Sequence, residues 1–312
     1  MAAKPHKAIL PLLLVTAVTA GLLVLDLLCG DSGFGPADGV LLRQIRLPRV
    51  LTALLVGAAL GLGGTEMQAV FRNPLADPHI MGISSGAGLG AAVAVLAIPS
   101  AALGIPAGAV LGALLTSLVV IAAAGKTRST ATLLLLGIML GFILSAVSAT
   151  LQYTADEESL KRFYSWAAGS FVGNGTQELW VLAASLGIGA LLAGLNARGL
   201  DLLLFGDDFA QAAGGQIRRI RTVSILGVCL MTGAATAFCG PVGFVGIAAP
   251  HVARWIGRSS SARSVLSLGA LCGAAIALLA DILSFLGPVP LPVGSTMALV
   301  GIPVILYILL KK

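Results

Sequence analysis

Long apolar segments alternate with short polar ones along the whole chain. A helix of about 20 apolar residues crosses a bilayer, and segments of that length recur, so we predict membrane-spanning helices. The ten predicted spans are 8–28, 48–70, 80–98, 106–124, 131–151, 178–196, 222–240, 243–257, 265–286 and 292–310. The eighth is short, which fits a segment sheltered by its neighbours. The pattern predicts an all-α integral membrane protein, one compact bundle that forms a single transmembrane domain over residues 1–312.

A helix break interrupts this pattern between the seventh and eighth spans. The apolar run ends at Gly240–Pro241, and the short segment that follows closes on Pro250, His251 and Arg254. Proline and glycine leave backbone groups unpaired, and lipid cannot pair them. We therefore expect protein or a water-filled cavity to cover the break.

Composition and charge agree with a membrane protein. Hydrophobic residues make up 57% of the chain and charged residues 10%, with a mean hydropathy of +1.00, whereas about a quarter of a soluble domain is charged. With the N-terminus inside, ten spans place 14 of the 19 Lys and Arg residues on the inner side. Basic residues collect on cytoplasmic loops, so we predict both termini in the cytoplasm. This bias explains the net charge of +6, and nucleic-acid binding is not predicted.

The sequence indicates no metal site. Cys29, Cys229, Cys239 and Cys272 are scattered in or beside apolar runs without the spacing of metal ligands. His251 has no His, Cys, Asp or Glu three or four residues away, so packing or hydrogen bonding is favoured over metal binding.

The carboxylates Glu66 and Asp281 lie well inside predicted spans. An ionised carboxylate is costly in a membrane and commonly has a functional role. A proton relay needs a chain of such residues, which this sequence does not offer.

Glycines at four-residue spacing predict close helix packing, because small residues let helix backbones approach each other in a membrane. The predicted packing sets are Gly57/Gly61, Gly82/Gly86/Gly90, Gly104/Gly108/Gly112, Gly137/Gly141 and Gly269/Gly273.

Two connections are too elaborate to be simple turns. The outer one, 152–177, has acidic, basic and aromatic residues at helical spacing, which predicts a short amphipathic helix at the interface. The inner one, 197–221, is amphipathic and glycine-punctuated, so it either lies on the membrane surface or docks a soluble partner.

Two short motifs resemble sites in soluble proteins. Gly82–Ile83–Ser84–Ser85–Gly86 has the spacing of a nucleophilic serine, which needs a histidine against the hydroxyl. An intramembrane serine hydrolase stays open as a remote alternative. Gly125–Lys126–Thr127 looks like the end of a phosphate-binding loop, but Val120 stands where that loop needs glycine and a span precedes it instead of a strand. Nucleotide binding by this chain is not predicted.

From about Arg43 to the C-terminus, the sequence resembles the FecCD family of ABC-importer permeases, which includes the cobalamin, haem and iron–siderophore permeases. The blocks that carry the resemblance are Arg46–Leu47–Pro48–Arg49, Arg72–Asn73–Pro74–Leu75–Ala76–Asp77–Pro78, Gly82–Ile83–Ser84–Ser85–Gly86–Ala87, Gly243–Phe244–Val245–Gly246, Pro250–His251–Val252–Ala253–Arg254, Ala280–Asp281, Leu291–Pro292–Val293–Gly294 and Gly301–Ile302–Pro303.

The resemblance implies a permease subunit in the cell inner membrane, not an enzyme. It implies ten spans per subunit and a homodimer whose interface forms the substrate path. It also implies two ABC ATPase subunits inside, and a periplasmic or lipid-anchored substrate-binding protein outside. This chain would bind no cofactor, because ATP is bound and hydrolysed by the partner. Ferric siderophore is the leading substrate class, with haem and cobalamin open.

The resemblance also implies residue roles. Arg46 and Arg49 would meet carboxylates of the binding protein. Asn73 and Pro74 resemble an inner gate. The inner loop matches the family's ATPase-coupling segment at Phe205, Gly206, Asp207, Ala210 and Gly214, with Phe205 and Asp207 replacing the commoner Leu and Glu. By analogy with the family, Ser145, Ser148 and Gln152 would line the substrate path. The structural motifs shared with the family contain Gly243, Gly246, Pro250, His251, Arg254 and Asp281.

Two departures concern the outer surface. Phe285 stands where many relatives have arginine, and Pro290 where glutamate is common, so the docking surface carries less charge than usual. A secondary transporter without an ATPase is the alternative function. It predicts more buried ionisable residues than Glu66 and Asp281, and it does not account for the coupling loop.

Overall fold

A computed structural model describes residues 6–30, 34–35, 38–97, 104–127, 129–259, 261–287 and 289–310, and every regular element in them is helical. The longer helices are α1 (His6–Leu28), α3 (Leu47–Phe71), α5 (Ile105–Ala124), α6 (Thr130–Tyr153), α8 (Thr176–Leu204), α10 (Ile217–Cys239), α12 (Ala262–Ser284) and α13 (Val293–Leu310). The shorter ones are α2 (Gly39–Leu41), α4 (Ile83–Ala92), α7 (Glu157–Ala167), α9 (Asp207–Ala212) and α11 (Val245–Gly257). Two π-helical turns, η1 (Leu42–Arg46) and η3 (Val93–Ala97), and a 3₁₀ turn, η2 (Pro78–Met81), complete the set.

All ten predicted spans coincide with helices. In the described part of the chain, seven helices are long and apolar enough to cross a membrane. The segments Ile83–Ala97 and Val293–Tyr307 are apolar but shorter, and α11 has only 13 residues. The all-helical membrane fold is therefore confirmed, whereas a count of ten complete crossings is not.

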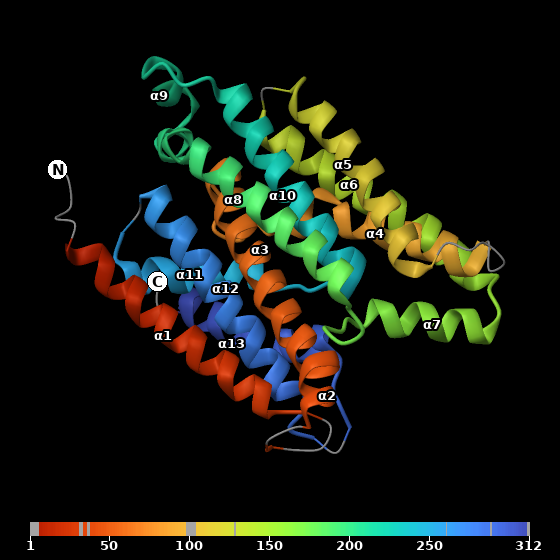
Figure 1. Ribbon diagram of the computed structural model, residues 1–312. Helices are drawn as coiled ribbons and strands as arrows, with labels where there is room; N and C mark the ends of the chain where they lie inside the picture. Colours follow the sequence, from red (N-terminus) through yellow and green to blue (C-terminus); the bar gives the residue numbers. More distant parts are fainter. Residues whose placement is uncertain are drawn as a thin grey trace.

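Helix α3 lies at the centre of the bundle and packs against α8, α10, α11 and α12. Figure 1 shows α1, α11, α12 and α13 on one side of it and α4, α5 and α6 on the other. Nearly all of the C-terminal two-thirds of α3 is buried, including Glu66 and Gln68. Helix α3 therefore contacts helices on both sides of the bundle.

The predicted glycine sets pack against one another. Gly57 and Gly61 of α3 face Gly273 and Gly269 of α12, and a Cβ on any of the four would overlap an atom of the other helix. Helices α4 and α5 meet in the same way through Gly86, Gly90, Gly108 and Gly112. Small residues therefore let these two helix pairs approach closely, as predicted.

The connections sort into two ends of the bundle as the predicted alternation requires. At one end, Arg72 after α3 lies 3.9 Å from Asp207 of α9, and the backbone N–H of Ala262 donates to Asp201 of α8 at 2.6 Å. At the other end, the backbone N–H of Val293 donates to the Gly169 carbonyl. Which end faces the cytoplasm stays a prediction, and Lys4, Arg128, Lys311 and Lys312 lie outside the described residues.

The amphipathic helix predicted in the outer connection is present as α7. The Asp156 carboxylate accepts from the Ser159 N–H at 2.9 Å and caps the helix, and this backbone hydrogen bond lowers the pKa of Asp156. Phe163 is buried, and Trp166 Nε1 donates to the Ala237 carbonyl at 3.2 Å. Helix α7 therefore lies against α4 and η3, and Trp166 connects it to the end of α10.

Candidate functional site

A short helix, α9, projects between α8 and α10. The chain enters it through Gly206, with a φ of 106°, and leaves it through Gly214, with a φ of 81°. Side chains make both conformations unfavourable. The two glycines of the sequence pattern thus set the entry and the exit of α9.

Asp207 ties α9 to two long helices. Its Oδ2 atom lies 2.7 Å from Arg221 Nη2 at the start of α10, and its Oδ1 atom lies 3.9 Å from Arg72 Nη2 at the end of α3. Ala210 is fully buried, and its carbonyl accepts from the Gly215 N–H at 2.7 Å. Asp207 therefore connects α9 to α3 and α10 through ion pairs. The sequence pattern contains Asp207 and Ala210 but does not reveal their partners, which are distant along the chain.

The opposite face of this segment presents aromatic side chains. Phe205 is 73% exposed and Phe209 is 51% exposed, and their ring centroids lie 5.1 Å apart. An exposed aromatic pair on a fixed element is typical of a protein contact. The sequence pattern omitted Phe209, although its spacing of four from Phe205 is a signal that could have found it.

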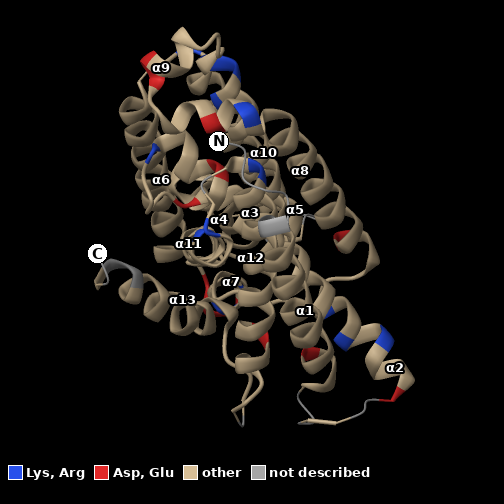
Figure 2. Ribbon diagram, turned by 90° about the vertical axis from the view of Figure 1, so that its left-hand side faces the viewer, with Lys and Arg blue, Asp and Glu red and all other residues tan. Residues whose placement is uncertain are grey.

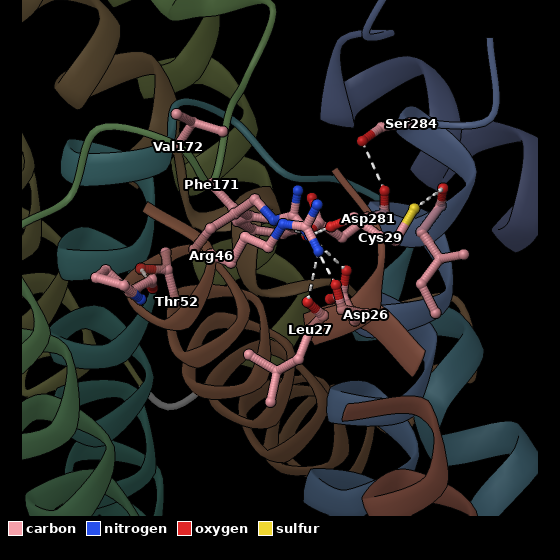
Figure 3. A network of polar contacts seen from close by, with 12 residues as sticks. Asp26, Leu27, Cys29, Arg46, Thr52, Phe171, Val172, Asp281 and Ser284 are labelled. Atoms are coloured by element: carbon pink, nitrogen blue, oxygen red, sulfur yellow. Dashed lines mark hydrogen bonds and ion pairs between the residues drawn. The ribbon is translucent and has the colours of Figure 1, made fainter. Parts of the chain in front are cut away.

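A buried ion network lies at the other end of the bundle and joins α1, α3 and α12 (Figure 3). Arg49 Nη2 lies 2.9 Å from Asp26 Oδ1, and Arg49 Nε lies 3.0 Å from Asp281 Oδ2. The same Nη2 donates to the carbonyls of Asp26 and Cys29 at 2.9 and 2.8 Å. All three charged side chains are at most 2% exposed. Because buried charges need partners, this network fixes three helix ends together.

Arg46 is also buried and makes internal contacts. Its Nη1 donates to the carbonyls of Leu27 and Gly35 at 3.1 and 2.8 Å. The resemblance implied that Arg46 and Arg49 face a docking partner, but both are only 2% exposed. Within this chain, Arg46 contacts Leu27 and Gly35 and Arg49 contacts α1 and α12, and docking of a partner at these positions stays a prediction. Phe285, which stands where relatives carry arginine, packs its ring 4.1 Å from the Arg49 guanidinium carbon.

The break between α10 and α11 is covered by protein, as predicted. The carbonyl of Cys239 accepts from the Ser170 N–H at 3.0 Å, and that of Val242 accepts from His79 Nε2 at 2.8 Å. Gly240 has a φ of 72°, and a Cβ there would overlap the carbonyl of Trp166. The break thus joins α7 and the η2 turn to the centre of the bundle.

The structural-motif residues after the break mostly contribute packing. Gly246 approaches the backbone of Gly64 in α3 so closely that a Cβ on Gly64 would overlap it. Pro250 is buried within α11. No atom lies within 4 Å of a Cβ built on Gly243, so packing does not require glycine at this position.

Polar residues of the same motif connect α11 to α3. His251 Nδ1 donates to the Ile247 carbonyl at 2.8 Å, and Arg254 Nη1 donates to Gln68 Oε1 at 2.6 Å. The described residues contain no group of three His, Cys, Asp or Glu side chains that could hold a metal ion. The hydrogen-bonding role favoured for His251 agrees with this geometry.

The gate and path residues lie apart from one another. Asn73 and Pro74 form the turn that ends α3, where Asn73 Oδ1 accepts from the Leu75 N–H at 3.0 Å. On α6, Ser145 donates to Ser85 of α4 at 3.2 Å; on the same helix, Gln152 Nε2 donates to Ser148 at 3.1 Å. These contacts place the residues but do not test a gate or a path.

Ser84 does meet a histidine. Its hydroxyl hydrogen-bonds His79 Nδ1 and lies 3.2 Å from the Thr236 hydroxyl. The His79 Nε2 atom bonds the Val242 carbonyl and lies 3.9 Å from Asp77. One contact of a hydrolase is therefore present, and the same contacts also explain how α4, α10 and the break are held together.

The comparisons with known proteins agree with one another. The sequence model of the FecCD transport family matches residues 8–311. The vitamin B12 import system permease protein BtuC of Citrobacter koseri is 36% identical over 301 residues, which cover 93% of this chain and 90% of that protein. BtuC of Salmonella typhi is 35% identical over the same share of this chain and 91% of its own length. A chain described as an inward-facing metal-chelate type ABC transporter has a TM-score of 0.87 at 29% identity, covering 96% of this chain and 99% of its own.

Proposed function

The chain belongs to the FecCD transport family, and from this premise we propose that it works as the permease subunit of an ABC importer for a metal chelate. ATP is hydrolysed by a separate partner that docks on α9. Nucleotide binding and hydrolysis then shift the permease between inward- and outward-open states.

The geometry of α9 is the observation that carries this proposal. Its aromatic pair is exposed, whereas Asp207 and Ala210 anchor it to α3 and α10. A docking element must combine an accessible surface with a rigid connection to the moving helices, and α9 has both. The helix α3 that it reaches is the central one of the bundle.

The remaining assembly follows from the family premise. We expect two copies of this chain to form a homodimer around the substrate path, with two ATPase subunits on the α9 end. A periplasmic or lipid-anchored binding protein delivers the chelate at the opposite end. The α9 end and both termini lie on the cytoplasmic side of the inner membrane.

Support for the substrate class comes from the names of the relatives and not from ligand-binding residues of this chain. The curated relatives reported above are named for vitamin B12 import, which places cobalamin first among the chelates to test. Ferric siderophore and haem are not distinguished from it by the residues described. All three therefore belong in the transport assay.

Uptake of labelled cobalamin, ferric siderophore and haem into vesicles holding the full complex tests this function. We expect ATP-dependent uptake of one of them. The double variant Phe205→Ser/Phe209→Ser should lose ATPase binding and uptake together, because it removes the exposed aromatic pair. Tyr153→Ser is the matched control, since Tyr153 is 92% exposed but lies at the far end of α6. Retention of ATPase binding by the double variant would contradict the proposed role of α9.

A further inference from the structure

A basic cavity lies beside α9, at the end of the bundle where α5 and α6 are connected. Its volume is about 800 Å³. The lining residues come from the α5–α6 connection, from α9 and from the first turns of α10. The charged ones are Lys126, Asp207, Arg218, Arg219 and Arg221. Figure 2 shows the basic residues gathered near α9 and the start of α10.

The cavity retains a positive charge after internal pairing. Asp207 is its one acidic lining residue, and it already pairs with Arg221 at 2.7 Å and with Arg72 at 3.9 Å. Lys126, Arg218 and Arg219 have no carboxylate within 4.0 Å among the residues that the structure describes. Lys126, Arg218 and Arg219 are also exposed or lie at the cavity surface. Their charges are therefore available to a ligand.

The cavity also offers uncharged hydrogen-bond donors, which favour a phosphate as the ligand. Helix α10 begins at Ile217, and its N-cap residue, Gln216, makes no side-chain capping bond. The first N–H groups of a helix are an anion site when no cap occupies them. Thr127 and Thr222, whose side chains carry hydroxyl donors, also line the cavity. Arginine, backbone N–H and hydroxyl donors together suit the several acceptor oxygens of a phosphate.

The position of the cavity indicates where that phosphate comes from. Helix α10 is one of the helices that are long and apolar enough to cross a membrane, so its first turn lies at the depth of the lipid headgroups. Basic residues at this depth on the cytoplasmic face attract anionic lipids. We propose that this cavity binds the phosphodiester headgroup of an anionic phospholipid of the inner leaflet, next to the segment that docks the ATPase. The lipid therefore contacts both α9 and the start of α10.

The Gly125–Lys126–Thr127 segment belongs to this cavity. It is an incomplete nucleotide-binding loop by its sequence, and the structure gives it a different setting. Its lysine and threonine face the same space as the start of α10. The segment thus contributes phosphate donors without forming a nucleotide site.

Native mass spectrometry of the full chain in its purified oligomer tests the lipid site. The probes are phosphatidylglycerol, phosphatidylcholine and inorganic phosphate. Arg218→Gln/Arg219→Gln should lower phosphatidylglycerol affinity about tenfold or more, because the double variant removes two charge-assisted donors. Lys126→Gln alone, in an exposed connection, should lower it to a smaller extent. Phosphatidylcholine binding should not change.

Arg198→Gln/Arg263→Gln is the matched control. Both arginines are exposed and lie outside the cavity lining, and the control removes the same charge from the same predicted side. An equal loss of phosphatidylglycerol affinity in the control would show that the lipid is held by diffuse electrostatic attraction, and it would overturn the proposed lipid site. Competition by millimolar inorganic phosphate would assign the cavity to a soluble phosphate instead. If lipid affinity is unchanged in the cavity variants while ATPase binding falls, the cavity receives an acidic surface of the ATPase and the lipid proposal fails.

Discussion

Replacement of Arg49 by methionine tests whether the buried ion network holds the helix ends together. The guanidinium lies 2.9 and 3.0 Å from two carboxylates, and it donates to two backbone carbonyls. Its removal leaves Asp26 and Asp281 buried without their cation. Removing one partner of a buried pair costs about 3–5 kcal/mol. Since one cation serves two carboxylates here, we expect a loss near the upper end of that range, a large share of a typical total stability.

Thermal unfolding of the purified protein in nanodiscs, followed by tryptophan fluorescence, measures this loss. Arg46→Met is the matched control, because Arg46 is equally buried and donates to the carbonyls of Leu27 and Gly35. It should cost less. The triple variant Arg49→Met/Asp26→Asn/Asp281→Asn should recover most of the stability, because it also removes the stranded charges.

Two outcomes would refute this reasoning. The first is an Arg49→Met protein that unfolds at the wild-type temperature. The second is a triple variant no more stable than the single one. If instead stability is retained and binding-protein affinity falls, Arg49 is a docking residue, as the family resemblance implied.

Three further predictions concern packing, capping and chemistry. Gly61→Val should destabilise the protein by about 1–3 kcal/mol, because a Cβ at this position overlaps the backbone of α12. Gly21→Val is the control and should not destabilise it, because no atom lies within 4 Å of a Cβ built there. Equal thermal stability of the two variants would contradict the packing of α3 against α12. Asp156→Ala should reduce hydrogen-exchange protection of α7 at pH 6. Because the folded pKa of Asp156 is lowered from its ordinary value of 3.8, the wild-type cap is complete above that value and is lost only as the pH falls through the lower folded one; unchanged protection in the variant would remove the cap from the account. Ser84→Ala should retain uptake, and the wild-type protein should not react with a fluorophosphonate probe; covalent labelling at Ser84 would revive the hydrolase alternative.

The sequence predicted the helices and the closest helix contacts well, because both depend on local spacing. Spans of about 20 apolar residues recur along the chain, and glycines at four-residue spacing let helix backbones approach each other in a membrane. The spacing predicted that these glycines lie in helix contacts, but the facing of Gly57 and Gly61 on Gly273 and Gly269 is seen only in the structure. The capped helix α7 was likewise visible in its acidic, basic and aromatic residues.

The environment of Arg46 and Arg49 could not be predicted in the same way. The second span was expected to begin at residue 48, but α2, η1 and α3 form one continuous helical segment from Gly39 to Phe71. Arg46 therefore lies on a helix face and not in the connection before the span. The carbonyl and carboxylate partners of the two arginines are on α1 and α12, and no local pattern relates such distant segments. The same holds for Asp207, whose partner Arg72 ends the central helix.

Buried charge also bears on the alternative of a secondary transporter. Glu66 is fully buried and makes no ion pair within the described residues, whereas Asp26 and Asp281 share Arg49. A relay needs groups that exchange partners along a path, and the network instead joins three helix ends. The alternative therefore rests on Glu66.

Accumulation of the chelate in proteoliposomes, measured against its concentration gradient, tests the central claim most directly. The permease is reconstituted with its binding protein, with and without the ATPase subunits, and ATP is supplied on the α9 side. We predict uphill accumulation only when both ATPase and ATP are present. Accumulation by the permease and binding protein alone would contradict the account.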